Sequence, residues 1–153
     1  MVYHITVDIR QSCSPHFDLE NIGPSNAWQV MGNTTLKLTM AGSGTGGTIT
    51  YTDPQTGVTF AFTCGVHNYK HWGDIAIVHR GQSADAITSS YYEKAWGGTE
   101  DAARCAARWR TPSSASVTHG TGTFTFVYTE TGENAKVNLL IMNQSSDTRS
   151  PIM

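Results

Sequence analysis

Alternation of apolar and polar residues with a period of two restricts this chain to folds built from short strands with one buried face. The pattern first appears over Tyr3–Ile9, where every second residue is apolar. It returns at Leu36–Met40, Ile49–Tyr51, Val58–Phe62, Ile75–Ile77, Phe124–Tyr128 and Val137–Ile141. Turn signals rich in Gly, Pro, Asn and Asp separate these segments. The sequence therefore predicts seven or more strands in an antiparallel sandwich or barrel.

One region, residues 83–109, departs from this pattern. β-branched residues become rare there, and alanine and polar helix formers replace them on either side of Gly97-Gly98. We therefore expect helix, loop and helix. Ser83 and Thr99 suit the two N-caps, because a side-chain oxygen at that position accepts a backbone N–H of the first turn.

Length and composition favour a single domain, which we place at residues 1–144, with a loose polar tail over 145–153. Only 14% of the 153 residues are charged and the net charge is −2, so the chain offers no basic field for a nucleic acid. Three cysteines without CxxC spacing argue against a disulfide framework and suit a reducing compartment. No signal peptide or membrane-spanning stretch is visible, and we expect a cytoplasmic protein.

The glycine-rich segment at residues 42–47 fits the pattern GxGxxG but not its function. A dinucleotide site needs a helix after the glycines, whereas residues 48–52 read as a strand. Two interpretations are left open: a simple hairpin turn, or a loop whose bare backbone lets a ligand approach closely.

No catalytic or metal-binding pattern stands out, and we expect neither an enzyme nor a cofactor. His67 and His71 are four residues apart, but Asn68 stands where a zinc-protease motif has Glu, and the neighbouring residues are strand-like. There is no GxSxG elbow, and the 12 acidic residues show no paired arrangement.

The run from Cys64 to Ile75 is dense in amide, imidazole, phenol and indole groups. A sugar offers hydroxyls that need fixed donors and acceptors, and an apolar face that packs on flat side chains, so Asn68 beside Tyr69 and Trp72 is chemically apt. The alternative is that both aromatic residues belong to the core and that Asn68 only forms a turn.

Two segments resemble the fungal fruit body lectins, the group that includes the common mushroom and bolete lectins. Residues 65–74 read GVHNYKHWGD, where members usually read GVHNYKRWCD, and residues 40–47, MAGSGTGG, are similar to the family's MGGSGTSG. Tyr91-Tyr92 and residues 127–141 also match, so that the resemblance spans roughly residues 3–142.

This resemblance implies an all-β, actinoporin-like sandwich of two sheets joined by a helix-loop-helix. It also implies a calcium-free lectin for the T-antigen disaccharide, galactose β1-3 linked to N-acetylgalactosamine. The expected partners are glycans and glycoproteins with O-linked core sugars, bound with avidity by a homodimer or homotetramer. Carried over by position, the site residues are Ser43 and Gly44, Asn68 and the backbone near Gly23, just before Trp28, with His67 and Tyr69 as neighbours that shape the site.

Many members also have a pocket for terminal N-acetylglucosamine, and here the match is partial. Asp74 and Ile75 match the family. However, Ile77 stands where the family has a threonine that donates a hydroxyl, and Glu100 stands near the position of the expected arginine. We do not expect simple conservation of this pocket unless Arg104 or Arg108 restores the cation. The candidates for this second site are Asp74, Ile75, Ile77 and Arg104.

Two other functions are compatible with the same features. A membrane-active, pore-forming protein would share the actinoporin-like sandwich but needs a detachable amphipathic N-terminal segment, whereas this chain begins with a strand. A hydrolase would need a cleft with a strongly perturbed carboxylate or histidine.

Overall fold

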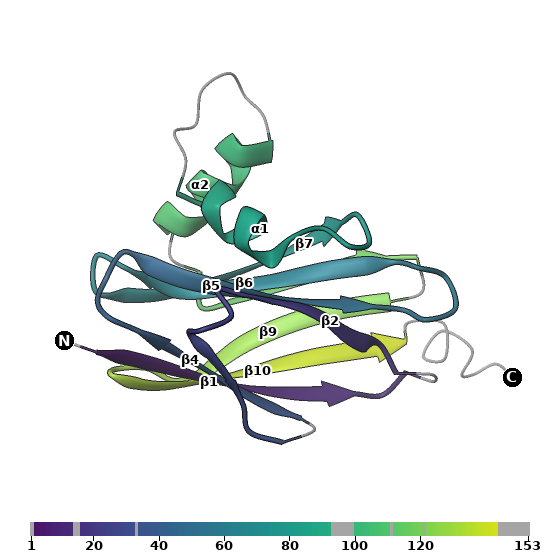
Figure 1. Cartoon of the computed structure of the whole chain (residues 1–153), viewed down its shortest axis with the longest axis horizontal. Coiled ribbons are helices and arrows are strands. Elements are labelled where there is room, and N and C mark those ends of the chain that lie inside the picture. Colours follow the sequence, from purple (N-terminus) through teal and green to yellow (C-terminus); the bar gives the residue numbers. More distant parts are fainter. Residues whose placement is uncertain are drawn as a thin grey trace, which may run out of the picture.

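Ten strands in the described part of the chain form two sheets that pack face to face, as the alternation predicts (Figure 1). The computed structural model describes residues 2–13, 16–32, 34–92, 100–110, 112–120 and 122–143, with the side chains of the last helix described from residue 103 onward. The predicted tail at 145–153 lies outside these residues.

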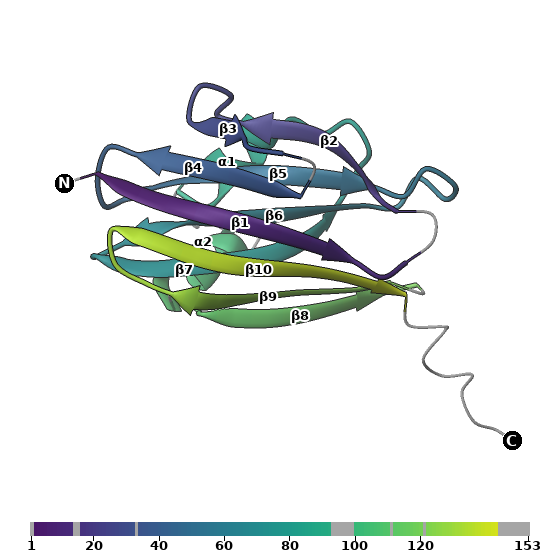
Figure 2. The same ribbon diagram turned by 90° about the horizontal axis from the view of Figure 1, so that it is seen from below.

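The larger sheet contains both the first and the last strand (Figure 2). Its order is β3 (Trp28–Val30), β4 (Thr35–Met40), β1 (Tyr3–Gln11), β10 (Asn134–Asn143), β9 (Gly122–Glu130) and β8 (Ser114–His119). β1 and β10 pair in parallel and the other neighbours are antiparallel. The smaller sheet has the order β2 (Asp18–Gly23), β5 (Thr45–Thr52), β6 (Thr59–His67) and β7 (Lys70–Val78).

One apolar core fills the space between the sheets, because alternate residues of each strand point to the same face. Phe60 on β6 and Phe124 on β9 stack with ring centroids 4.1 Å apart, and Phe62 lies 5.3 Å from Phe126. All four rings are fully buried. Truncating such a ring to alanine typically costs about 3–5 kcal/mol, so these contacts hold the two sheets together.

Two helices, α1 (Ala84–Ser90) and α2 (Glu100–Arg110), cover the outer face of the smaller sheet (Figure 1). Ser83 caps α1 as predicted, since its Oγ accepts the backbone N–H of Ala86 at 3.3 Å. The predicted cap at Thr99 and the break at Gly97-Gly98 lie outside the described residues. Beneath the helices lies a second buried cluster, Ala61, Trp72, Ile87 and Tyr91.

No helix in the described ranges is long and apolar enough to cross a membrane. Three strands, β2, β3 and β8, were not among the segments that the alternation predicts. β3 is only three residues long, and β2 and β8 each contain consecutive exposed residues. None of the three therefore shows a sustained alternation of buried and exposed residues.

Candidate functional site

A two-residue turn between β6 and β7 displays Asn68 and Tyr69 to solvent. Both residues have positive φ, 50° for Asn68 and 63° for Tyr69, as the tight turn between the paired residues His67 and Lys70 requires. Asparagine tolerates this conformation, but tyrosine is strained in it. Tyr69 is nevertheless 78% exposed, so no packing of its ring explains why a tyrosine stands there.

The glycine-rich segment at residues 42–47, the glycine loop, lies directly against this turn. Ser43 Oγ accepts the backbone N–H of Tyr69 at 2.9 Å, and the backbone N–H of Gly44 donates to the carbonyl of Val66 at 2.6 Å. Gly44 has φ +88° and open space around its Cα, so the loop needs glycine for its conformation. Ser43, Gly44, Asn68 and Tyr69 thus form one continuous surface at the end of the smaller sheet.

His67 lies beside this surface and is fixed by α2. Arg108 Nη1 lies 3.0 Å from Nδ1 of His67, and the exposed ring of Trp109 contacts the imidazole edge-on at 4.3 Å. Burial and the positive charge of Arg108 lower the pKa of His67, so the ring is neutral at pH 7. Arginine can only donate, which places the proton of His67 on Nε2. Nε2 is buried and has no hydrogen-bond partner within the described residues.

Gly23 ends β2, the neighbour of β5, whose first residues belong to the glycine-rich segment. Gly23 pairs with Thr48, three residues further along β5 than Thr45, and it is buried under the start of α1. Its carbonyl accepts the indole N–H of Trp28 at 3.2 Å. A Cβ at Gly23 would come within 2.6 Å of Asp85, so close helix packing accounts for this glycine.

Strands β6 and β7 occupy most of the run from residue 64 to residue 75, and only residues 68 and 69 lie between them. Trp72 is buried in the cluster under the helices, whereas Tyr69 is exposed, so the two aromatic residues differ in role. His67 and His71 lie on neighbouring strands, and no group of three or more metal-ligating side chains occurs within the described residues.

Comparison with known proteins identifies the family. The sequence model of the fungal fruit body lectin family matches residues 1–139. The chain belongs to the fungal fruit body lectin family. It is therefore a carbohydrate-binding lectin and not an enzyme, as the sequence predicts.

Solved structures agree with this assignment. The chain is similar to the lectin XCL of Xerocomus chrysenteron, in its wild-type form and in a form with three methionine substitutions. The identity is 26% and the TM-score 0.76 in both cases. The match covers 92% of this chain and 98–99% of the other. The predicted sandwich and the family resemblance are both confirmed.

The lectin has a hollow of about 310 Å³ between β7 and α2, at the position expected for the second sugar site. Asp74, Ile77 and Arg104 line it, and Arg110 does so as well. Arg104 is buried and its Nη1 donates to Ser90 Oγ at 3.0 Å. An arginine of α2 therefore does lie near Asp74, whereas the side chain of Glu100 is outside the described part of the helix.

Asp74 lies in the middle of β7. Its Oδ2 accepts the hydroxyl of Tyr91 at 2.6 Å. Burial raises the pKa of Asp74, while the hydrogen bond from Tyr91 and the charges of Arg104 and Arg110 act in the opposite direction. Ile75 is buried in the core between the sheets and does not line the hollow.

Proposed function

We propose that this lectin binds galactose β1-3 N-acetylgalactosamine, or a closely related N-acetylated glycan, at the surface formed by Ser43, Gly44 and Asn68. The hydrogen bond from the Tyr69 N–H to Ser43 carries the proposal, because it joins the glycine loop and the β6–β7 turn into one site. His67 and Tyr69 shape its edges. Gly23 contributes to the scaffold beneath α1.

The exposed amide of Asn68 supports selectivity for a sugar. It offers a donor and an acceptor on one rigid turn, which matches a hydroxyl and an acetamido oxygen. A wrong epimer would leave one of these groups unpaired at a cost of about 1–3 kcal/mol.

Glycan-array screening followed by calorimetry tests this proposal. Asn68→Gly keeps the turn without strain at φ 50° and removes the amide, so we expect it to lose most of the affinity for the best glycan while remaining folded. Ser43→Ala removes the acceptor of the Tyr69 N–H and should also weaken binding, and Ser12→Ala, at an exposed serine just beyond the end of β1, is its control. Full affinity in Asn68→Gly, or binding abolished by a chelator, would refute the assignment. Leakage of glycan-free vesicles would favour the membrane-active alternative.

The hollow beside Asp74 is a second candidate sugar site. Its carboxylate and the nearby guanidinium of Arg104 provide an acceptor and donors, although Ile77 packs partly against the core and adds no hydroxyl. Titration with N-acetylglucosamine tests it: saturable binding that Asp74→Asn abolishes supports a surviving pocket, and no binding shows that Asp74 is only structural.

We further propose that the lectin forms a homodimer or homotetramer. A single shallow site binds weakly, and several sites on a symmetric assembly gain avidity without new contacts. Light scattering at micromolar concentration should give a multiple of 16.6 kDa, and a monomer mass would contradict this.

A further inference from the structure

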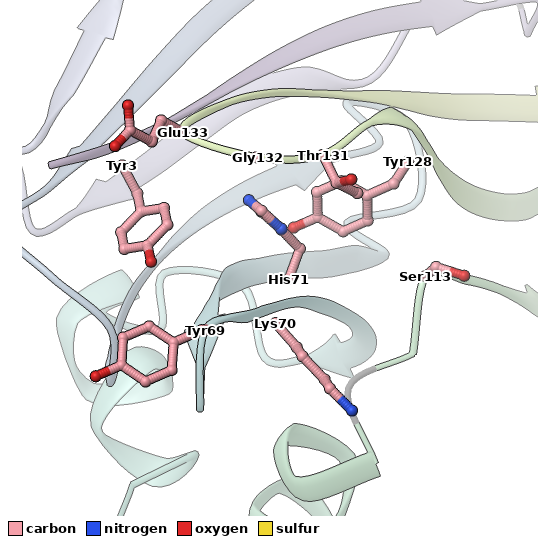
Figure 3. Close-up of a pocket in the computed structure, with 9 residues that line it drawn as sticks. All are labelled: Tyr3, Tyr69, Lys70, His71, Ser113, Tyr128, Thr131, Gly132 and Glu133. Atoms are coloured by element: carbon pink, nitrogen blue, oxygen red, sulfur yellow. The ribbon is translucent and has the colours of Figure 1, made fainter. Parts of the chain in front are cut away.

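A cavity of about 420 Å³ opens between the two sheets, where the β6–β7 turn approaches the β9–β10 turn (Figure 3). Neither the sequence patterns nor the proposed site accounts for it. Its volume lies within the range of small-molecule sites, about 300–1,000 Å³.

Three tyrosine rings form the apolar part of this cavity: Tyr3, Tyr69 and Tyr128. The hydroxyl of Tyr128 donates to the carbonyl of Trp72 at 2.7 Å, so that its ring is held in place. Tyr69 stands at the opening with its ring facing solvent (Figure 3). Flat aromatic rings pack well against the apolar face of a pyranose.

His71 stands between Tyr3 and Tyr128, with ring centroids 6.2 Å and 5.6 Å away (Figure 3). Its side chain is only 9% exposed. The backbone of Gly132 is near enough to favour the charged ring, but Nε2 has no partner of regular hydrogen-bond geometry within the described residues. A buried polar atom without a partner is uncommon, and His71 belongs to the lining of the cavity, so a ligand there is the partner that we infer for it.

The charges around the cavity favour a neutral ligand. Lys70 and Glu133 lie on opposite sides of it (Figure 3) and are its only charged lining residues within the described chain, so no net field selects an anion. Burial lowers the pKa of His71, so this residue adds no positive charge at neutral pH. A sialic acid or phosphate is therefore disfavoured relative to an uncharged sugar.

Tyr69 links the cavity to the proposed site, because its backbone N–H binds Ser43 while its ring lines the cavity. We propose that the cavity binds one further neutral pyranose ring of the same glycan whose disaccharide lies on Ser43 and Asn68. This inference rests on the proposed function and extends it from a disaccharide to a trisaccharide.

Calorimetry with the methyl glycoside of the disaccharide, and with trisaccharides that add one neutral pyranose at either end, tests the extension. We expect at least one trisaccharide to bind the wild-type lectin about fivefold more tightly than the disaccharide. Thr131→Trp, which fills the cavity from its exposed rim, should abolish that gain and keep disaccharide affinity within about twofold. Thr129→Trp, at an exposed position near the end of β9 and outside the cavity, should behave as wild type.

A second readout follows the cavity directly. The ring proton resonances of His71 should shift with the trisaccharide and not with the disaccharide. If no trisaccharide exceeds the disaccharide, or if the gain persists in Thr131→Trp, the extension is wrong although the proposed function stands. If the wild-type lectin binds no disaccharide, the proposed function itself fails, and the extension fails with it.

Discussion

The hydroxyl of Tyr91 donates a 2.6 Å hydrogen bond to the carboxylate of Asp74. Tyr91 is the fully buried residue that follows α1, and Asp74 lies in the middle of β7, so the bond ties the helical cover to the smaller sheet. Arg104 of α2 lies over the Tyr91 ring, 5.8 Å from its centroid. The bond thus ties Asp74, which lines the hollow that is the second candidate sugar site, to the helical cover.

Tyr91→Phe should lower the free energy of unfolding by about 1–3 kcal/mol, because the half-buried carboxylate of Asp74 loses a charge-assisted hydrogen bond. Urea unfolding followed by fluorescence measures the change. Tyr69→Phe removes an exposed hydroxyl and is the matched control, for which no change is expected. Equal stability of the two variants would show that the bond to Asp74 contributes nothing.

Asp74→Asn should change how stability depends on pH. Burial raises the folded pKa of Asp74 above the unfolded value of 3.8, so the folded lectin retains this proton to higher pH than the unfolded chain does. The free energy of unfolding of the wild-type lectin therefore decreases as the pH rises from 3.8 through the folded pKa of Asp74. The stability of Asp74→Asn relative to wild type should increase with pH across this window. Urea unfolding at several pH values measures it, and a constant difference would contradict the raised pKa.

Below pH 6.5 the lectin should lose stability through His71. Burial holds the folded pKa of this histidine below its unfolded value of 6.5, so the unfolded chain takes up the proton first. The contribution of His71 to the free energy of unfolding is therefore fully present above pH 6.5, and it is lost as the pH falls toward the folded pKa. In His71→Gln the thermal midpoint should fall less steeply with acid than in wild type. His119→Gln, at an exposed histidine on β8 outside the cavity, is the matched control.

Tyr69→Gly should separate stability from binding. At φ 63° a tyrosine costs about 1–2 kcal/mol that glycine avoids, while glycine loses about 0.5–1 kcal/mol to chain entropy. The variant should therefore be as stable as wild type or up to about 1.5 kcal/mol more stable, yet bind the glycan more weakly because the exposed ring is gone. Thermal unfolding and calorimetry measure both quantities, and unchanged affinity would remove Tyr69 from the binding surface.

Local patterns determined much of this fold. The period of two in segments such as Tyr3–Ile9 sets one buried face per strand, and Ser83 sets the start of α1, because strand faces and helix caps depend only on neighbouring residues. The family signature likewise marked Asn68 and the glycine loop, although only the structure showed that a hydrogen bond joins them.

Contacts between distant segments were decided only by the tertiary structure. The parallel pairing of β1 with β10 brings Tyr3 into one cavity with Tyr128 and His71, residues that no sequence spacing relates. The packing of α2 on β7 likewise brings Arg104 to Asp74 and takes Arg108 to His67. Strand order and helix docking depend on how the whole chain buries its apolar faces, so the local sequence determines which groups are displayed and the global packing determines which of them meet.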